Sequence, residues 1–92
     1  MRRIELSKQA GAFLKQLPGK HARQIIERLD LLAEGAEKLP SEILKGYAPM
    51  RRLRAGEYRI IFVVEGELVQ VRLIGKRNDD EIYKSLERFG RK

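Results

Sequence analysis

The spacing of apolar residues along the chain changes once, near its middle. Through residues 8–34 they recur every three or four positions, around Phe13 in a first run and around Ile25 in a second. This spacing places them along one face of a helix. From residue 51 onward apolar and polar residues alternate, which is typical of strands. The pattern therefore predicts a helical first half followed by a sheet.

Two helices are expected, over residues 8–17 and 20–34. Ser7 directly precedes the first helix and can cap its N-terminus, and Pro18 and Gly19 interrupt the helical pattern. Helices separated by so short a break fold back on each other, which predicts an antiparallel helical hairpin.

The segments on either side of this hairpin are less regular. Residues 2–7 alternate well enough for a short strand, with Ile4 and Leu6 facing inward. Residues 34–49 contain prolines and glycines without a clear period. They are expected to form a connection that can hold a single helical turn.

Three strands are expected in the second half, with turns of hairpin length between them. A short final helix with an apolar face follows, capped near Asn78. We therefore predict one α+β domain over residues 1–92: an N-terminal strand and a helical hairpin packed on an antiparallel β-meander, with a short C-terminal helix. The expected strands are residues 51–54, 58–64 and 68–74, and the final helix contains Ile82, Leu86 and Phe89.

Composition narrows the class of protein. The chain has no cysteine, which excludes disulfides, zinc–thiolate centres and cysteine nucleophiles. Its basic start is not followed by the apolar stretch of a signal peptide, and no apolar run approaches the length of a membrane span. A soluble, cytoplasmic protein with no membrane association, no metal and no small-molecule cofactor is expected.

The charge balance points to an anionic partner. Lys and Arg number 20 against 13 Asp and Glu, which gives a net charge of +7 and an isoelectric point near 10.1. Basic residues cluster between Lys45 and Arg59, where the one acid is Glu57, and again between Leu68 and Arg77. General solubility would explain the total, but the clustering favours nucleic acid.

The alternation of side chains along a strand sorts the arginines by face. Arg52 and Arg54 share one face, and Leu53 points the other way, toward the helices. The next expected strand is apolar on both faces except near its start, where Arg59 stands. If Arg77 returns beside that start, several guanidinium groups converge on one patch. Their planar forks suit phosphate oxygens.

Other kinds of site find little support. No Ser/His/Asp set, metal-ligand cluster or glycine-rich phosphate loop occurs in the sequence. The single histidine, His21, stands at the start of the second helix, far in sequence from the basic strands. The acidic residues 79–81 are better explained as stabilising a helix N-terminus than as chemistry.

Two segments carry a resemblance to a known family. LKGYAPMRRLRAGEYRIIF contains a glycine, a basic strand, a glycine turn, Tyr-Arg and an apolar strand, and LIGKRNDDEIY contains Gly-Lys-Arg followed by a helical tyrosine. In these segments, and in the order of its elements, the chain resembles the RelE-type toxins of bacterial and archaeal toxin–antitoxin modules. Those toxins are small basic ribonucleases that cut messenger RNA in the decoding site of the ribosome.

The resemblance implies a reaction and a set of residues. A ribose 2′-hydroxyl would attack the adjacent phosphate, leaving a cyclic or 3′-phosphate end and a free 5′-hydroxyl. Guanidinium groups would stabilise the negative charge that gathers on the phosphoryl oxygens. The implied catalytic residues are Arg52, Arg59, Arg77 and Tyr83, and the implied RNA-binding residues are Lys45, Arg51, Arg54 and Lys76.

The resemblance also implies partners. These are the ribosome with its messenger RNA, including contacts with 16S ribosomal RNA, and a cognate antitoxin protein that covers the basic patch. The sequence departs from the family pattern in two places. Met50 occupies a position where some relatives carry a lysine, which leaves Arg51 to fill that place, and no histidine lies near the site as it does in other branches.

Three alternatives stay open. ParE-type relatives share the predicted fold but poison DNA gyrase, and they lack the Arg and Tyr set. A non-catalytic RNA-binding module would need exposed aromatic residues for stacking, whereas Phe13 and Phe62 are expected in the core. A structural protein is the third alternative.

Overall fold

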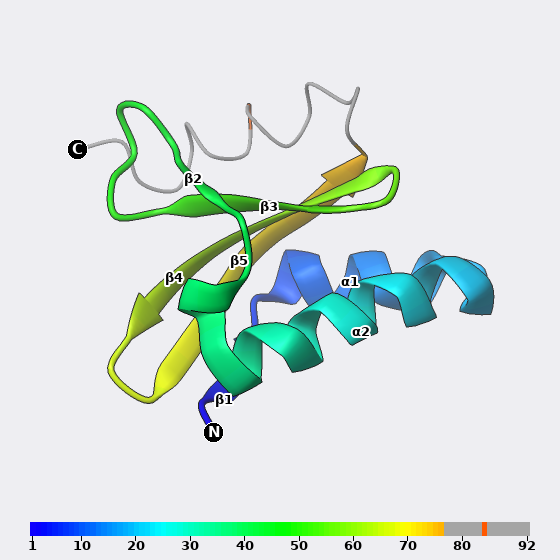
Figure 1. The fold of residues 1–92 in the computed structure, drawn as a ribbon. Coiled ribbons are helices and arrows are strands. Elements are labelled where there is room, and N and C mark those ends of the chain that lie inside the picture. The colour runs from blue at the N-terminus through cyan, green and yellow to red at the C-terminus, as the bar shows by residue number, and fades with distance from the viewer. Residues whose placement is uncertain (77–83, 85–92) are drawn as a thin grey trace.

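The computed structural model describes residues 1–76 and Lys84 of the chain. Figure 1 shows two layers, a helical hairpin beneath a twisted sheet. The predicted strands and helices up to residue 76 are present in the predicted order, one further short strand lies between them, and the predicted C-terminal helix lies outside the described residues. The elements are β1 (Arg3–Leu6), α1 (Lys8–Gln16), α2 (Gly19–Gly35), the 3-10 helix η1 (Ala36–Lys38), β2 (Glu42–Ile43), β3 (Arg51–Ala55), β4 (Tyr58–Glu65) and β5 (Leu68–Lys76).

The sheet has the strand order β1-β5-β4-β3-β2. Strands β3, β4 and β5 form the predicted antiparallel meander. β1 pairs with β5 in parallel, so the sheet is mixed rather than purely antiparallel. The helical hairpin carries the chain beneath the sheet to the β2 edge, and the meander then runs back toward β1 (Figure 1). β2 was not predicted, because a strand of two residues has too little pattern to recognise.

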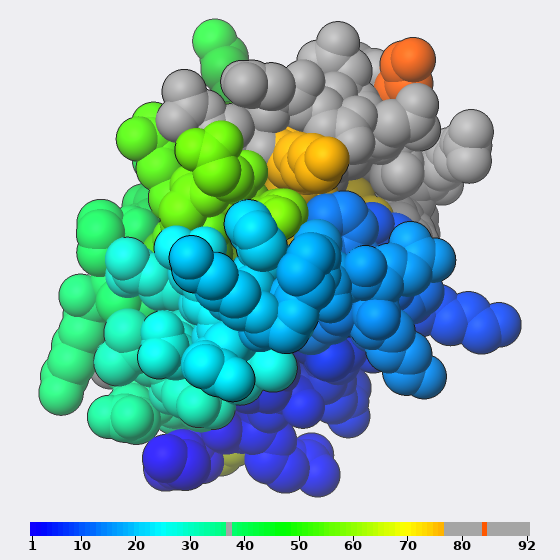
Figure 2. Space-filling view, turned by 90° about the vertical axis from the view of Figure 1, so that its right-hand side faces the viewer, coloured from blue at the N-terminus to red at the C-terminus, as the bar shows by residue number. Residues whose placement is uncertain are grey.

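Glycine sets both hairpin turns. Gly56 and Gly66 have φ angles of 61° and 57°, a left-handed conformation that residues with a Cβ atom rarely adopt. Gly56 also lies against the side-chain amide of Gln24 of α2, and a Cβ atom at this position would require that amide to move. Figure 2 shows the β3–β4 turn (yellow-green) resting on α2 (cyan). This turn therefore ties the sheet to the helix layer.

The main hydrophobic core lies between the helices and one face of the sheet, called here the helical face. Both helices bury most of the stripes that their spacing predicted, with Ala10 of α1 and Ile25 of α2 fully buried. Ile26, which the same spacing placed on the stripe of α2, is 46% exposed, so that part of the prediction was wrong. The prediction that Leu6 faces inward was wrong, because Leu6 lies at the end of an edge strand and is 42% exposed. The core residues are Ala10, Ile25, Leu29, Leu32, Ala36, Leu53, Ala55, Tyr58, Ile60, Phe62, Val69, Val71 and Ile74.

The opposite face of the sheet carries a second, smaller core. Leu44 packs with Ile61 and Leu73, and Tyr47 and Met50 add partly buried contacts. The residues at 44, 47 and 50 belong to the loop between β2 and β3, which folds over this face. β4 is therefore covered on both sides along most of its length, as its apolar sequence predicted.

Two side chains at the start of α1 join it to β5. The hydroxyl oxygen of Ser7 accepts a hydrogen bond from Ala10 N at 3.1 Å, which confirms the predicted N-cap, and the hydroxyl donates to the carbonyl of Arg72. Gln9 bonds both backbone groups of Ile74, donating to O at 2.8 Å and accepting from N at 2.9 Å. The Gln9 amide thus takes the place of a strand partner once β1 has ended.

β5 contains a β-bulge. Phe62 of β4 pairs with Val71, but Ile61 pairs with Leu73, so Arg72 is an extra residue in β5. A shift of one residue reverses the face on which all following side chains lie. The end of β5 therefore presents its side chains on the opposite faces from those that a regular strand would give.

Candidate functional site

Three arginines of β3 and β4 lie on the face of the sheet opposite the helices, called here the basic face (Arg52, Arg54 and Arg59). The register pairs Arg54 directly with Arg59, and Arg52 with Ile61. Residues so paired share a face and have Cβ atoms about 5 Å apart. Two like charges therefore stand side by side, which is unfavourable unless an anion joins them.

Arg59 is half-buried, and its neighbours in the sheet do not neutralise it. On the β5 side the register places Gly75, which has no side chain to offer. Within the described residues, Nε of Arg59 is buried and has no hydrogen-bond partner. An unpaired buried donor costs about 1–3 kcal/mol, and more when it is charged. The surroundings of Arg59 therefore favour a bound anion.

A hollow of about 440 Å³ opens at the edge of β3. Arg52 and Arg54 line it from β3, and Arg28 lines it from α2. Arg52 Nη2 lies 3.2 Å from Glu42 Oε2, and because the Glu42 side chain is 67% exposed, this ion pair contributes little stability. The described residues that line it are Arg28, Pro40, Ser41, Glu42, Arg52, Leu53 and Arg54.

Sequence reasoning did not identify Arg28 as part of this group. It stands on a helix, 24 positions before Arg52, the next basic residue of the hollow, and no motif connects it to β3. Only the packing of α2 against the sheet brings its guanidinium to the same hollow as Arg52 and Arg54. With it, three guanidinium groups and one carboxylate surround the opening, a surplus of positive charge that suits phosphate.

Two of the predicted RNA-binding residues lie away from the basic face. Arg51 pairs with Phe62 on the helical face, where its Nε donates to Ser41 Oγ at 2.8 Å. Lys76 is exposed and pairs with Tyr58, which also belongs to the helical face. For Lys76 the cause is the bulge in β5, which reverses the faces of the residues after it.

Of the remaining predicted site residues, one is described by the structure and two are not. Lys45 is exposed in the loop that folds over the basic face. Arg77 and Tyr83, predicted as catalytic residues, lie outside the described residues. The structure therefore brings Arg52, Arg54 and Arg59 to one face of the sheet.

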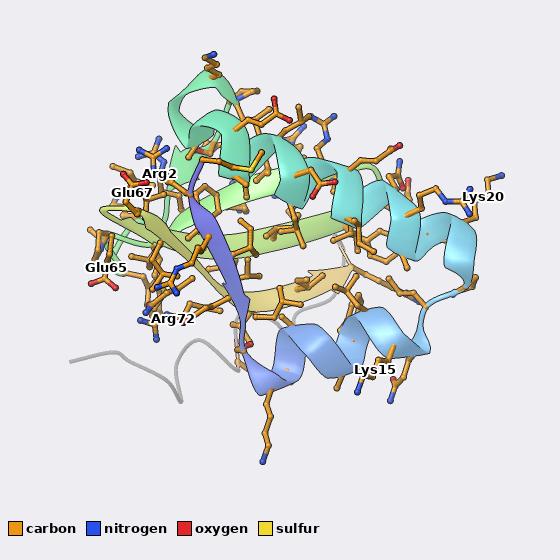
Figure 3. The ribbon with its side chains drawn as sticks, turned by 90° about the horizontal axis from the view of Figure 1, so that it is seen from below. Arg2, Lys15, Lys20, Glu65, Glu67 and Arg72 are labelled. Atoms are coloured by element: carbon orange, nitrogen blue, oxygen red, sulfur yellow. The ribbon has the colours of Figure 1, made fainter. Side chains whose placement is uncertain are left out.

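Arg72 is a basic residue that the sequence analysis did not assign to a site. Its Nη2 donates to Gln70 Oε1 at 3.0 Å, whereas its buried Nε has no partner among the described residues. Figure 3 shows its side chain at the end of the sheet where Glu65 projects, far from Lys15 at the end of α1. The signal for this position is a charged residue inside the otherwise uncharged strand LVQVRLIG.

The single histidine has a structural contact. Tyr58 Oη and His21 Nδ1 are 3.1 Å apart, and their rings meet edge to face with centroids 5.7 Å apart. This contact joins α2 to β4 on the helical face. In the part of the chain that the structure describes, no group of three or more His, Cys, Asp or Glu could hold a metal ion. Nor is any described helix long and apolar enough to cross a membrane.

Comparison with known proteins identifies the family. A family model described as the ParE toxin of the type II toxin-antitoxin system parDE matches residues 4–81. Because this match spans most of the chain, the chain belongs to that family, which is part of the RelE/ParE toxin superfamily. It is a toxin of the type II toxin–antitoxin class. No curated protein sequence matches it.

Solved structures of both branches resemble the chain. The archaeal RelE–RelB complex from Pyrococcus horikoshii OT3 has 27% identity and a TM-score of 0.67, over 84% of this chain and 96% of that chain. The isolated E. coli RelE toxin has 21% identity and a TM-score of 0.71, over 98% and 100%. The chromosomal ParDE system from P. aeruginosa has 20% identity and a TM-score of 0.68, over 83% and 96%. At 21% and 20% identity, the last two similarities show only that the fold is shared.

Proposed function

We propose that this toxin is a ribosome-dependent endoribonuclease that cuts messenger RNA in the decoding site and so stops translation. The observation that carries the proposal is the pair of opposed arginines, Arg54 and Arg59, with a buried Nε on Arg59 that has no hydrogen-bond partner among residues 1–76. Such a pair is unfavourable in the isolated protein and favourable once a phosphate lies against it. The resemblance to RelE toxins supports the same activity.

The chemistry follows from where negative charge develops. When a ribose 2′-hydroxyl attacks the adjacent phosphate, charge grows on the phosphoryl oxygens in the transition state. Guanidinium groups held in a partly dry site stabilise that charge more than the ground state, which lowers the barrier. We assign this role to Arg59 and Arg77, and we assign the contacts to flanking phosphates to Arg54, Lys45 and Arg28.

The site is less well equipped for proton transfer than for stabilising negative charge. A guanidinium holds its protons too firmly to be a good general base. Arg52 and Tyr83 are the two residues assigned to this step. A ribosome that holds the messenger strand in an attack-ready geometry would supply the positioning that so small a site lacks. Dependence on the ribosome is therefore part of the proposal, as is neutralisation by a cognate antitoxin of the kind seen in the RelE–RelB complex.

A second function is inhibition of DNA gyrase. The observation that favours it is the family model itself, which is described as a ParE toxin, together with the ParDE structure. On this alternative the basic face would contact an acidic surface of gyrase or its DNA rather than a scissile phosphate.

One experiment separates the two functions. The toxin is expressed under tight control, and messenger 5′ ends are mapped in translating cells and in cells whose translation is blocked. The nuclease proposal expects cuts inside translated frames that disappear when ribosomes are cleared, and Arg77→Ala is expected to abolish growth arrest in a folded protein. Supercoiling defects with intact messages would establish the gyrase reading instead.

A further inference from the structure

A second hollow lies on the helical face, at the end of the sheet that the helices leave uncovered. α2 ends at Gly35, and the chain then passes through η1 to Ser41 along the edge of the sheet. The hollow between this segment and the strands has a volume of about 470 Å³, within the range of ligand-sized pockets. We call it the η1 pocket, and it is lined by Ala36, Leu39, Pro40, Ser41, Arg51, Phe62 and Val64.

The η1 pocket is apolar except at one point. Leu39 and Val64 are half-buried, which leaves part of each side chain open to a partner, and Phe62 is fully buried beneath them. The cross-strand pairing continues this surface outward to Ile43, which is 57% exposed. Large apolar side chains that stay open to water in this way are typical of surfaces that bind another molecule.

Arg51 is the one charged residue among the described residues of this lining, and it is held in place. Its Nε donates to Ser41 Oγ at 2.8 Å and its Nη2 donates to Ser41 O at 3.1 Å. These bonds use two of the five N–H groups of a guanidinium. The remaining N–H groups can donate to a carboxylate without any rearrangement, and a group fixed before binding loses less entropy when it binds.

We infer that the η1 pocket is an anchor site for a protein partner, which inserts one large apolar side chain between Leu39 and Val64 and places a carboxylate on Arg51. A nucleic acid does not fit, because one cation in an apolar lining offers too little charge for a phosphate backbone. An acidic partner fits the net charge of +7. The inference rests on the proposed function in one respect, that this partner is the antitoxin.

The position of the pocket has a consequence for neutralisation. It lies on the helical face, whereas Arg54 and Arg59 lie on the basic face. Substitutions in the pocket should therefore lower the affinity of the antitoxin for the toxin without changing the toxic activity. Such variants would still arrest growth, and the antitoxin would no longer rescue the cells at its normal level of expression.

The first test uses a peptide probe on the purified chain, labelled with ¹⁵N and ¹³C. N-acetyl-Leu-Glu-amide is titrated to millimolar concentration and compared with N-acetyl-Leu-Gln-amide. The inference expects shifts in the Leu39 and Val64 methyl signals and in the Arg51 Nε signal, larger for the Glu peptide because it alone carries a carboxylate. Equal shifts for both peptides, or shifts elsewhere only, would overturn the assignment.

The second test measures the dissociation constant of the cognate antitoxin with variants of the toxin. Val64→Glu and Leu39→Asp place a carboxylate where the partner's apolar group would insert, and each is expected to raise the constant at least about tenfold. Ile26→Glu makes the same kind of change at an exposed residue of α2 and is expected to leave the constant unchanged. Arg51→Gln is expected to raise it about three- to tenfold.

The outcomes are separable from those of the proposed function. Unchanged dissociation constants for the antitoxin in all pocket variants would overturn the inference. A change in the self-association of the toxin variants would also overturn it, because the pocket would then bind a second copy of this chain. If Val64→Glu and Leu39→Asp unfold, Arg51→Gln decides the matter, because it alters only a hydrogen-bonded group at the pocket rim. Failure of the wild-type toxin to cut messages would overturn the nuclease proposal while leaving these binding constants meaningful.

Discussion

The two faces of the sheet differ in how completely the polar groups of their side chains are paired. On the helical face Tyr58 is enclosed, with Phe13 and His21 against its ring and its hydroxyl bonded to His21. On the basic face, one residue further along β4, Arg59 stands opposite Arg54, and its buried Nε has no partner in the part of the chain that the structure describes. Consecutive residues of a strand thus occupy a satisfied environment and an unsatisfied one.

This difference teaches where stability and function are located. A strand alternates its side chains between two faces, so the same backbone can carry a core on one side and a binding surface on the other. Beneath the two helices, the helical face follows the rules of packing and pairing. The basic face breaks the rule against opposed like charges, and such local conflicts are expected at functional sites. The following predictions test this division.

The largest effect is expected on the helical face. Phe62→Ala removes a fully buried aromatic side chain and should lower the free energy of unfolding by about 3–5 kcal/mol, a large part of the total for a small domain. Urea denaturation followed by circular dichroism measures it. Ile43→Ala, at an exposed position in the same cross-strand row, is the control and should change stability little. A loss below about 1 kcal/mol in Phe62→Ala would contradict the core assignment.

On the basic face the expected effect is on activity rather than on stability. Arg59→Ala should reduce messenger cleavage by about 10²–10³-fold, as loss of a charge-stabilising donor does in other enzymes, and should leave the free energy of unfolding unchanged or raised. Counting cleaved 5′ ends at matched expression measures the first quantity. Arg23→Ala, an exposed arginine on α2, provides the control. Full activity in folded Arg59→Ala would remove Arg59 from the site.

A smaller effect is expected at the junction of the two layers. Gln9→Leu removes both hydrogen bonds to the backbone of Ile74 and leaves its N–H and C=O groups unpaired. The free energy of unfolding should fall by about 1–3 kcal/mol, and the amide hydrogen of Ile74 should exchange faster. The same substitution at the exposed Gln16 should be nearly neutral. If Gln9→Leu were equally neutral, the amide would not be acting as a strand partner.

The smallest effect brings the two faces into direct comparison. Arg54→Glu turns the repulsion across the strands into attraction toward Arg59 and should raise the free energy of unfolding by about 0.2–1 kcal/mol. The gain should shrink with added salt because the pair is near the surface. Messenger cleavage should fall in the same variant. A loss of stability together with activity would show that the opposed arginines are not in conflict.

Sequence by itself determined the elements and most of their faces. The change from a helical to a two-residue period is a local property, and burial follows it because each helix and strand must hide its apolar side. It placed Leu53 toward the helices and Arg52 and Arg54 on the opposite face, as the structure confirms. It also located the Ser7 cap, whose hydrogen bond reaches only three residues along the chain.

Tertiary structure alone decided what depends on contacts between distant segments. The parallel pairing of β1 with β5 and the entry of Arg28 into the hollow at β3 arise from packing that no local pattern encodes. The clearest example is Lys76, which alternation along β5 would place on the basic face and which the bulge at Arg72 moves to the helical face. A single extra residue reverses every face after it, and whether a strand accepts that residue depends on its partner strand rather than on its own sequence.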